Sequence, residues 1–359
     1  MGEADSFLLV VRGLDPVGTG RLVEFAAAGL AAAGRRVAVA VTTVGGGVAD
    51  RLVARGFGVH RLGGRPVGDV AATLRLAGLV RQLRPAVVLG FGRSQIVRTA
   101  LASRLVPRCR GVVWLGLPPR GPRQIWALRR LERVVAASAH VAAACRRAGV
   151  REGRLALVPP GIATDTGAGL SRGEVAARLG LDPAKQWTLA VAPLEPAARL
   201  PRLLWAIDQL GVVRKDLEHV LVGSGPLLGQ IRRRARAQEL AERLFILPTC
   251  DVLPDLLGHV KLVWQSGEVA LGGALLDGMA RGVPAVAVAS DVARELVADG
   301  ETGRIVPPEP ESELPRRAFG ILEDEALARR YGEAAAARGA ERFPVERFVG
   351  GLLEALGGS

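Results

Sequence analysis

The sequence predicts an α/β protein made of two domains, each with a doubly wound parallel sheet. Three observations predict it: the chain has 359 residues, 49% of them are hydrophobic, and short apolar runs alternate with amphipathic helical stretches. A chain of this length exceeds one comfortable core, so two domains of about 150–200 residues are expected. Apolar runs without alternation are typical of strands buried on both faces of a parallel sheet.

The first domain is predicted over residues 1–165. Its opening strand, Phe7–Val11, leads into a glycine-bearing turn and a helix that closes at Gly34. The later strands are expected at Val37–Thr43, Phe57–Leu62, Ala86–Phe91, Gly111–Leu115 and Arg133–Ala137. Helices such as Val67–Leu83 separate these runs, which is the periodicity of βαβ units.

The second domain is predicted over residues 166–359, after a Gly-, Thr- and Ala-rich stretch, 161–171, with the composition of a linker. Its strands are expected at Trp187–Ala192, His219–Gly223, Leu244–Leu247, Leu262–Gln265, Ala285–Ala289 and Arg304–Val306. Helices Glu323–Arg342 and Glu346–Leu356 end the chain, and the last is expected to pack back on the first domain. Because ligands of such sheets bind beyond the carboxyl ends of the strands, the cleft between the domains is the expected site.

Composition narrows the possible partners. The formal net charge is +13, but only three of the 48 basic residues are lysine, which indicates arginine-rich codon usage as much as a binding surface. The aromatic fraction is 4%, so few rings could stack on bases, and nucleic acid is not an expected partner. The remaining excess charge favours anionic ligands or anionic membrane surfaces.

The cysteines and the N-terminal residues indicate a cytoplasmic protein. Cys109, Cys145 and Cys250 lack the spacing of a redox pair or a metal site, which favours reduced thiols. The acidic start of the chain does not resemble a signal peptide, and no run of 18 apolar residues could form a membrane span. No metal and no cofactor are expected, and no hydrolase, zinc-protease or Walker motif is present.

Three segments of the second half resemble the family-4 glycosyltransferases. His219–Pro226 is similar to the family's strand and Gly-x-Gly-Pro turn, Leu275–Val286 to its "LLEAMARGVPVV" helix and strand, and Asp299–Pro308 to its "DGxTGxxVPP" segment. The first half agrees more loosely at Val10–Gly18, Glu132–Ser138 and Leu157–Ile162. In all, the resemblance covers nearly the whole chain.

The resemblance implies a GT-B fold, in which two Rossmann-like domains have parallel sheets facing across a cleft. It implies a bacterial glycosyltransferase that moves a hexose-like sugar from a nucleotide-sugar donor to a glycan or lipid-linked acceptor. Transfer would be metal-independent and retaining, with no cofactor beyond the nucleotide-sugar co-substrate.

The second-domain donor residues implied by the resemblance surround one helix start. Gly272, Gly273 and Ala274 open this helix, where unpaired N–H groups suit a diphosphate. Asp277 stands where the family has a glutamate that holds the ribose hydroxyls, and a shorter carboxylate can still accept two hydrogen bonds. The alternative for Asp277 is a solvated acid on a helix face.

Further donor residues are implied in glycine turns. Gly223 and Gly225 belong to the Gly-x-Gly-Pro turn, and Gly18 and Gly20 precede or open a helix in the first domain. Arg12 adds a positive charge beside that first-domain loop. The alternative for the glycines is ordinary turn structure.

The sequence departs from the family at catalytic positions. Val269 stands where the family has a glutamate, and Pro193 and Ala198 stand where it has an arginine and a lysine. Glu268 and Arg199 lie next to these positions and are the expected catalytic residues. Such losses also favour a catalytically inactive GT-B protein that binds a nucleotide, a glycan or a partner transferase, whereas a nucleotide-sugar epimerase is less favoured.

A basic segment, Arg120–Arg133, interleaves arginines with apolar residues and predicts an amphipathic helix. Such a helix could rest on an anionic membrane, which would place the protein at the inner face of the membrane. The alternative is an ordinary surface helix with solvated arginines.

Overall fold

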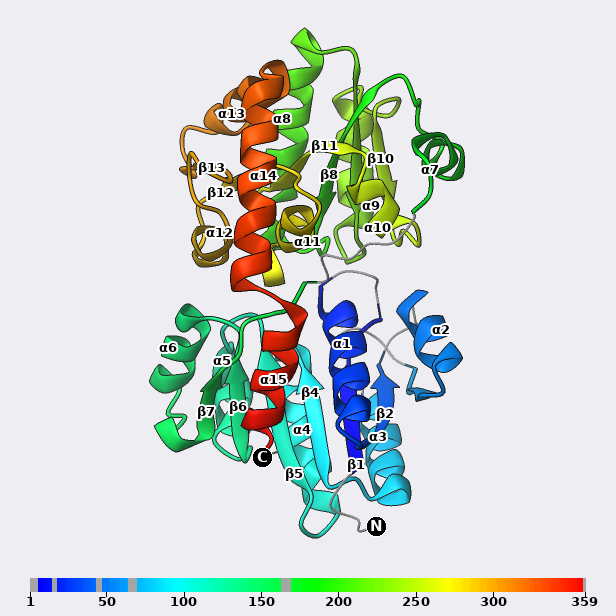
Figure 1. Cartoon of the computed structure of the whole chain (residues 1–359), viewed down its shortest axis with the longest axis vertical. Helices are drawn as coiled ribbons and strands as arrows, with labels where there is room; N and C mark the ends of the chain where they lie inside the picture. Colours follow the sequence, from blue (N-terminus) through cyan, green and yellow to red (C-terminus); the bar gives the residue numbers. More distant parts are fainter. Residues whose placement is uncertain (1–5, 15–17, 43–46, 64–69, 163–168, 358–359) are drawn as a thin grey trace. The chain divides into compact units, whose positions relative to one another are not determined.

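The protein comprises two compact units, unit 1 (residues 1–161 and 345–359) and unit 2 (residues 162–344) (Figure 1). The computed structural model describes residues 6–14, 18–42, 47–63, 70–162 and 169–357. The predicted domain boundary at residue 165 lies outside the described residues.

Unit 1 contains a seven-stranded parallel sheet in the order β3-β2-β1-β4-β5-β6-β7. The strands are β1 (Ser6–Val11), β2 (Arg36–Val41), β3 (Gly58–Arg61), β4 (Val87–Phe91), β5 (Arg110–Leu115), β6 (Arg133–Ala136) and β7 (Leu155–Leu157). The apolar runs predict the first six of these to within two residues. They miss β7, because a three-residue strand at the sheet edge has no buried residue to mark it.

The helices of unit 1 connect these strands. They are α1 (Thr19–Ala32), α2 (Gly47–Ala54), α3 (Val70–Leu83), α4 (Ile96–Ala102), α5 (Gly121–Leu128), α6 (Ala139–Arg147) and α15 (Val345–Ala355). Strand order runs outward from β1 in one direction and from β4 in the other, so right-handed crossovers place α1 and α2 on the face opposite α4, α5 and α6. Helix α15 packs on α1, where a Cβ on Gly29 would come within 2.3 Å of Val349.

Unit 2 contains a six-stranded parallel sheet in the order β10-β9-β8-β11-β12-β13. The strands are β8 (Gln186–Val191), β9 (Leu217–Val222), β10 (Leu244–Leu247), β11 (Val260–Gln265), β12 (Ala285–Val288) and β13 (Gly303–Val306). All six were expected from apolar runs, which confirms the α/β class and the parallel sheets.

The helices of unit 2 are α7 (Arg172–Leu179), α8 (Leu200–Val213), α9 (Leu228–Ala237), α10 (Leu253–Leu257), α11 (Leu275–Ala280), α12 (Asp291–Leu296), α13 (Glu313–Glu323) and α14 (Glu325–Arg342). The helix expected over Glu323–Arg342 corresponds to α14, which begins two residues later, at Glu325. Asp324 separates it from α13 and caps it by accepting the Leu327 N–H at 2.9 Å.

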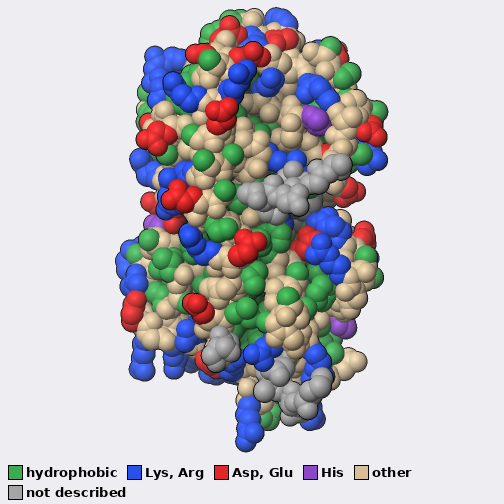
Figure 2. Space-filling view, viewed as in Figure 1, with side chains coloured by type: hydrophobic (Ala, Val, Ile, Leu, Met, Phe, Trp, Pro, Cys, Tyr) green, Lys and Arg blue, Asp and Glu red, His purple; other side chains and the backbone are tan. Residues whose placement is uncertain are grey.

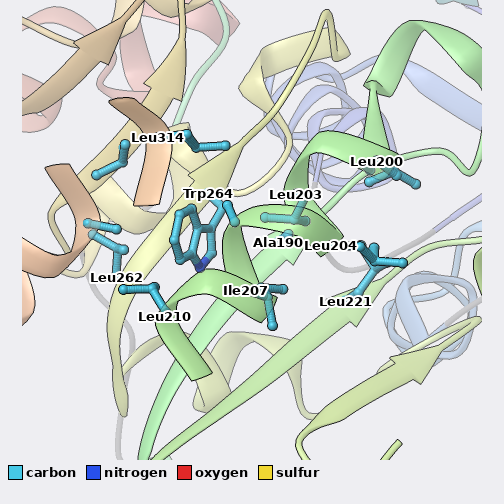
Figure 3. Packing of buried hydrophobic residues seen from close by; sticks show 14 of the residues in the cluster. Ala190, Leu200, Leu203, Leu204, Ile207, Leu210, Leu221, Leu262, Trp264 and Leu314 are labelled. Carbon is cyan, nitrogen blue, oxygen red and sulfur yellow. The ribbon is translucent and has the colours of Figure 1, made fainter. Parts of the chain in front are cut away.

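The core of unit 2 lies where α8 and α13 cover the sheet (Figure 3). Trp264 of β11 is 2% exposed and is surrounded by leucines from α8, including Leu203 and Leu210, and by Leu314 of α13. This packing fixes the ends of β8 and β11, from which the candidate site is built.

Candidate functional site

The candidate site of unit 2 lies at the carboxyl ends of β8 and β11. The chain winds from β8 through β9 to β10 in one direction and from β11 through β12 to β13 in the other, so strand order reverses between β8 and β11. Open α/β sheets bind ligands at this point, because the loops after the two central strands separate there.

The loops after β8 and β11 are joined by hydrogen bonds. The Ser266 hydroxyl donates to the carbonyl oxygen of Ala198 at 2.7 Å. The Glu268 N–H donates to the carbonyl oxygen of Ala197 at 2.9 Å. Glu268 and the segment that ends at Arg199 are therefore held in one local framework.

Glycines bring further backbone into contact with the β8 loop. A Cβ on Gly223 would lie 1.9 Å from the carbonyl oxygen of Ala192, and one on Gly273 would lie 2.0 Å from that of Val191. A Cβ on Gly225 would come within 2.6 Å of the same loop. These distances leave no room for a side chain, so Gly223 and Gly225 have a steric role whether or not they contact a ligand.

The entry to α11 is an unusual backbone turn. Leu271, Gly272 and Gly273 have φ angles of 56°, 70° and 60°, all in the left-handed region, before Ala274 caps the helix. Leu271 is the costly member, since a branched side chain disfavours this conformation. The turn follows a 3₁₀ turn, Ala270–Gly272, so the helix starts at Leu275 and not at Gly272.

Asp277 lies in the first turn of α11 and is 2% exposed. The alternative interpretation of this residue as a solvated helix-face acid is therefore wrong. The next residue explains its position, because a Cβ on Gly278 would come within 3.0 Å of Val263 in β11, so the helix lies directly on the strand. The structure thus holds a carboxylate in a buried position beside the turn.

The two expected catalytic residues differ in their surroundings. Arg199 is exposed and adopts a left-handed conformation, with φ at 51°, as the cap residue of α8. Glu268 is half-buried, whereas Val269 is 5% exposed and belongs to the hydrophobic core. Ala198 is fully buried, so both positions at which the family has charged side chains hold buried apolar residues here.

Two polar residues at the end of β11 were missed by the sequence interpretation. Ser266 links the two loops, and Gln265 is 3% exposed and donates to the Gly267 carbonyl oxygen at 2.8 Å. Within the described residues the Gln265 side-chain oxygen accepts no hydrogen bond. A polar pair directly after the apolar run Val263-Trp264 is the signal that could have identified them.

In unit 1, the expected residues lie at the carboxyl end of β1. Arg12 is half-buried directly after the strand, and Gly18, with φ at 63°, is the cap residue of α1. Gly20 is buried in the first turn of that helix. Residues 15–17, between these positions, lie outside the described residues. Strand order reverses between β1 and β4, so this end of β1 is the corresponding position in the first sheet.

Two of the four histidines, His219 and His259, make contacts within unit 2. His219 of β9 is fully buried and its Nδ1 lies 2.6 Å from the Thr188 hydroxyl. Burial lowers the pKa of His219 to about 3, so the imidazole is neutral at physiological pH. His259 lies 2.9 Å from the Leu170 carbonyl oxygen.

Cysteine and metal chemistry find little support in the described part of the chain. Burial raises the pKa of the Cys109, Cys145 and Cys250 thiols to about 11, which leaves them protonated and unreactive. Among the described residues, no group of three or more His, Cys, Asp or Glu side chains is placed to hold a metal ion.

The predicted basic helix over Arg120–Arg133 is wrong in extent. Helix α5 ends at Leu128, and Arg133 belongs to β6. Arg129 is exposed, and its Nε donates to the Ala148 carbonyl oxygen at 2.9 Å. Lysine and arginine side chains are spread over the visible face with acids between them (Figure 2).

Helix α5 nevertheless borders an apolar groove. The groove has a volume of about 410 Å³ and is lined by Val97, Leu101, Pro122, Arg123 and Trp126. The Trp126 ring is 43% exposed, and the Arg130 guanidinium stacks 3.9 Å from its centre. No helix in the described ranges is long and apolar enough to cross a membrane.

Two family models match the chain. The model described as "Glycosyl transferases group 1" matches residues 171–338, and "Glycosyltransferase Family 4" matches residues 17–166. A relative in Bacillus anthracis, N-acetyl-alpha-D-glucosaminyl L-malate synthase, is 25% identical over 47% of this chain and 45% of its own. Phosphatidyl-myo-inositol mannosyltransferase of Mycolicibacterium smegmatis is 31% identical over 41% of this chain and 38% of its own. The matched region thus spans less than half the length of these relatives.

Solved structures share the fold across nearly the full chain. The Anabaena protein HepE in complex with UDP and glucose has a TM-score of 0.80 at 19% identity, and covers 98% of this chain and 99% of its own. WaaG, a glycosyltransferase involved in lipopolysaccharide biosynthesis, has a TM-score of 0.75 at 14% identity, and covers 98% of this chain and 100% of its own. At these identities the likeness establishes the fold.

Proposed function

This chain belongs to the family-4 glycosyltransferases of the GT-B fold, and we propose that it moves a hexose-like sugar from a nucleotide-sugar donor to a glycan or lipid-linked acceptor. The observation that carries the proposal is Asp277, a buried carboxylate beside the left-handed turn that enters α11. The family's ribose-binding glutamate corresponds to this residue. HepE was solved with UDP and glucose, so UDP-glucose is the first donor to test.

In this proposal the diphosphate of the donor contacts the turn at Gly272 and Gly273. Glycines let the backbone approach phosphate oxygens closely, and N–H groups at the start of a helix complement their charge. Arg199 supplies the positive charge that the buried Ala198 cannot, and its exposed position after β8 supports this role. In unit 1, Arg12, Gly18 and Gly20 form a second phosphate-binding turn.

Catalysis in this proposal needs no metal and retains the anomeric configuration. The bond from the sugar to the diphosphate breaks and the diphosphate leaves with the electron pair. The acceptor hydroxyl oxygen bonds to the same carbon on the same face, and its proton passes to the leaving diphosphate oxygen. The main requirement is stabilisation of the charge that develops on the diphosphate, which Arg199 and the glycine turn would provide. Glu268, held by its backbone hydrogen bond to Ala197, would orient the sugar hydroxyls.

The test compares two aspartates that lie in the first turns of two helices. Asp277 lies in the first turn of α11 and is buried, and Asp291 lies in the first turn of α12 and is exposed. At about 100 times its dissociation constant, a nucleotide should stabilise the wild type by ~2.7 kcal/mol, which a thermal-shift assay detects. Asp277→Asn should weaken binding about tenfold, because it removes a charge-assisted hydrogen bond to the ribose.

Asp291→Asn should bind the nucleotide like the wild type. Equal binding by both variants would remove Asp277 from the site. Turnover of UDP-glucose, GDP-mannose or ADP-glucose should follow the same pattern among the variants.

The alternative function is a catalytically inactive protein of the same fold that binds a nucleotide, a glycan or a partner transferase. The burial of Val269 and Ala198 favours it, because apolar residues occupy two positions at which the family has charged side chains. Nucleotide binding without turnover of any of these donors at long incubation would establish this alternative.

For localisation, we propose a cytoplasmic protein that contacts an anionic membrane through α5 and its flanking arginines. The exposed Trp126, the apolar groove beside it and Arg123 supply the apolar and basic parts of such a contact. Co-sedimentation with phosphatidylglycerol vesicles should exceed that with phosphatidylcholine vesicles and should fall in Trp126→Ala. Equal sedimentation of the variant and the wild type would exclude this surface.

A further inference from the structure

Helix α9 of unit 2, labelled in Figure 1, has a basic side that faces solvent. The helix has ten residues, and the arginines among them are all exposed: Arg232, Arg233, Arg234 and Arg236. No acidic residue occurs between Leu228 and Ala237. On the opposite side, Ile231 and Ala235 are buried in the core of unit 2. The helix is therefore held by its apolar side, and its solvent-facing side is positively charged.

The four guanidinium groups have no partner in the part of the chain that the structure describes. None of them forms a hydrogen bond, an ion pair or an aromatic contact with a described residue. Glu239 and Glu242 follow the helix and are exposed, but neither pairs with an arginine of α9. The positive charge of this side is therefore uncompensated within the described residues.

Arginine-rich codon usage explains only part of this pattern. Helix α14 also has four arginines, but its 18 residues include three glutamates. In α13, Glu313 pairs with Arg316 at 2.5 Å and with Arg317 at 3.2 Å. Codon usage raises the number of arginines throughout the chain, but it does not explain why α9 has four of them in ten residues with no acid among them.

The arginines of α9 destabilise the helix that carries them. Arg232 and Arg236 lie one helical turn apart, and Arg233 and Arg236 are three residues apart. Like charges at these spacings repel each other across the helix surface. A surface of negative charges facing the helix would relieve this repulsion, because it brings counter-charges to all four arginines. An anionic surface is therefore the kind of partner that this side of α9 fits.

The other exposed residues of α9 distinguish between classes of anionic partner. They are Gly229, Gln230 and Ala237, so the solvent-facing side has no large apolar or aromatic side chain. Protein interfaces depend on buried aromatic and large apolar anchors, and single-stranded nucleic acids are bound by aromatic rings that stack on bases. An anionic membrane requires neither, because a cluster of four or more cations on one helix is enough to attract it.

We propose that α9 binds the anionic headgroups of a phospholipid membrane through these arginines, which gives unit 2 a membrane contact of its own. This contact differs in kind from the one proposed for α5 in unit 1, which uses the exposed Trp126. Salt screens charges but not apolar burial, so salt should weaken the α9 contact and leave the Trp126 contact in place. The inference does not depend on sugar transfer.

The experiment measures co-sedimentation of the full chain with phosphatidylglycerol vesicles and with phosphatidylcholine vesicles, at about 0.1 M and about 1 M salt. The test variant combines Arg232→Gln, Arg233→Gln and Arg236→Gln. Each cation near an anionic surface strengthens binding about fivefold, so this variant should bind phosphatidylglycerol about a hundredfold more weakly than the wild type at the lower salt. At the higher salt the two proteins should bind alike.

The matched control removes the same number of charges from unit 2 without clustering them. It combines Arg178→Gln, Arg294→Gln and Arg329→Gln, at exposed positions of α7, α12 and α14. This control should bind phosphatidylglycerol vesicles within about threefold of the wild type, because charges that lie away from the surface are screened. Equal losses in the two variants would mean that net charge attracts the protein, and would overturn the role of α9.

Melting temperatures show whether the two variants are folded. If the triple variant of α9 unfolds, Arg233→Gln alone keeps the test, with an expected loss of about fivefold. Binding at low salt that depends on Trp126 and not on α9 would contradict this inference and leave the α5 contact standing. Stronger α9-dependent binding to polyuridylate than to phosphatidylglycerol vesicles, at equal phosphate concentration, would make nucleic acid the partner and the membrane assignment wrong. Either failure leaves the Asp277 test of the proposed function untouched.

Discussion

The carboxyl edges of the two sheets differ in charge and in packing. At the edge of unit 1, the described residues that follow the strands include arginines and no acids. At the edge of unit 2, acids outnumber the one arginine, Arg199, in the corresponding described segments: Glu195, Asp251, Glu268, Glu309 and Glu311. Within the described residues, the segments after the strands of the two sheets therefore differ in charge, and the net charge of the whole chain describes neither set.

The glycines of the two edges also serve different purposes. Gly223 and Gly273 of unit 2 allow close backbone contact, whereas Gly18 and Gly92 of unit 1 have positive φ angles, and a Cβ on either would meet no heavy atom within 4 Å. The edge of unit 2 is thus a packed framework that fixes its ligand-binding groups, and the edge of unit 1 is more open. This comparison yields three predictions, given from the largest expected effect to the smallest.

The first prediction concerns the packing difference. Gly223→Ala should lower the free energy of unfolding by about 3 kcal/mol, because its Cβ would lie 1.9 Å from the Ala192 carbonyl oxygen and the loop after β8 must move. Gly92→Ala should cost only about 1 kcal/mol, since it meets conformational strain but no neighbour. Urea unfolding of both variants measures the difference. Equal losses would mean that the two edges are packed alike.

The second prediction concerns the arginines. Arg172 of unit 2 donates to the carbonyl oxygens of Pro183 and His259, both at 3.0 Å, and stacks 3.7 Å from the Trp187 ring centre. Arg172→Leu should lower the free energy of unfolding by about 2 kcal/mol, because the half-buried His259 carbonyl loses its donor and the Trp187 ring loses the guanidinium stacked on it.

The matched variant in unit 1 is Arg104→Leu, at an exposed arginine of the 3₁₀ turn Ser103–Leu105. It should change the stability by less than about 0.5 kcal/mol, as a surface substitution does. Urea unfolding midpoints compare it with Arg172→Leu. A large loss in the Arg104 variant would mean that this arginine also has a structural role.

The third prediction concerns acid stability. The pKa of His219 falls from its ordinary value near 6.5 to about 3 on folding. As the pH is lowered, the imidazole is therefore protonated in the unfolded chain before it is protonated in the folded protein. Stability from the neutral imidazole is complete above pH 6.5 and is lost as the pH falls toward 3, with a loss of about 1.4 kcal/mol at pH 5.5.

Amide hydrogen exchange, followed separately in peptides from each unit, measures this loss of stability with falling pH. Amides of β8 and β9 should lose protection between pH 7 and pH 5.5 more than those of β1 and β4, since the histidines of unit 1, His60 and His140, are only partly buried. His219→Gln should remove the difference. If it persists in that variant, another group causes it.

Much of the fold follows from the apolar runs, because strands buried on both faces need continuous apolar residues. Boundaries shifted by one or two residues, and the short edge strand β7 was missed. The basic segment shows why pattern alone fails: its arginines and leucines alternate at helical spacing, yet the helix ends at Leu128, Arg129 bonds to the Ala148 carbonyl, and a strand begins at Arg133. Amphipathic spacing indicates which residues are apolar, but it does not predict where a helix ends.

The site was only partly predictable. Sequence order placed Gly273 and Asp277 at the start of a helix after β11. The structure has Asp277 in the first turn of α11, whereas Gly273 belongs to the left-handed turn before the helix. It could not show that Asp277 is buried, because burial depends on how closely Gly278 lets α11 approach β11. Nor could it show the left-handed Leu271, or that Ser266 binds the loop after β8, since these depend on contacts between distant segments.

The topology makes unit 2 a continuous insertion within a discontinuous unit 1. The two ends of the insertion meet, because Ile162 forms a bridge with Pro344 and its N–H donates to the Phe343 carbonyl oxygen at 2.8 Å. During synthesis, unit 2 is complete before the ribosome makes α15, the last helix that unit 1 needs to cover α1. The segment encoded second can therefore finish folding first, and a gene fragment for residues 162–344 has adjoining ends suited to expression as a separate protein.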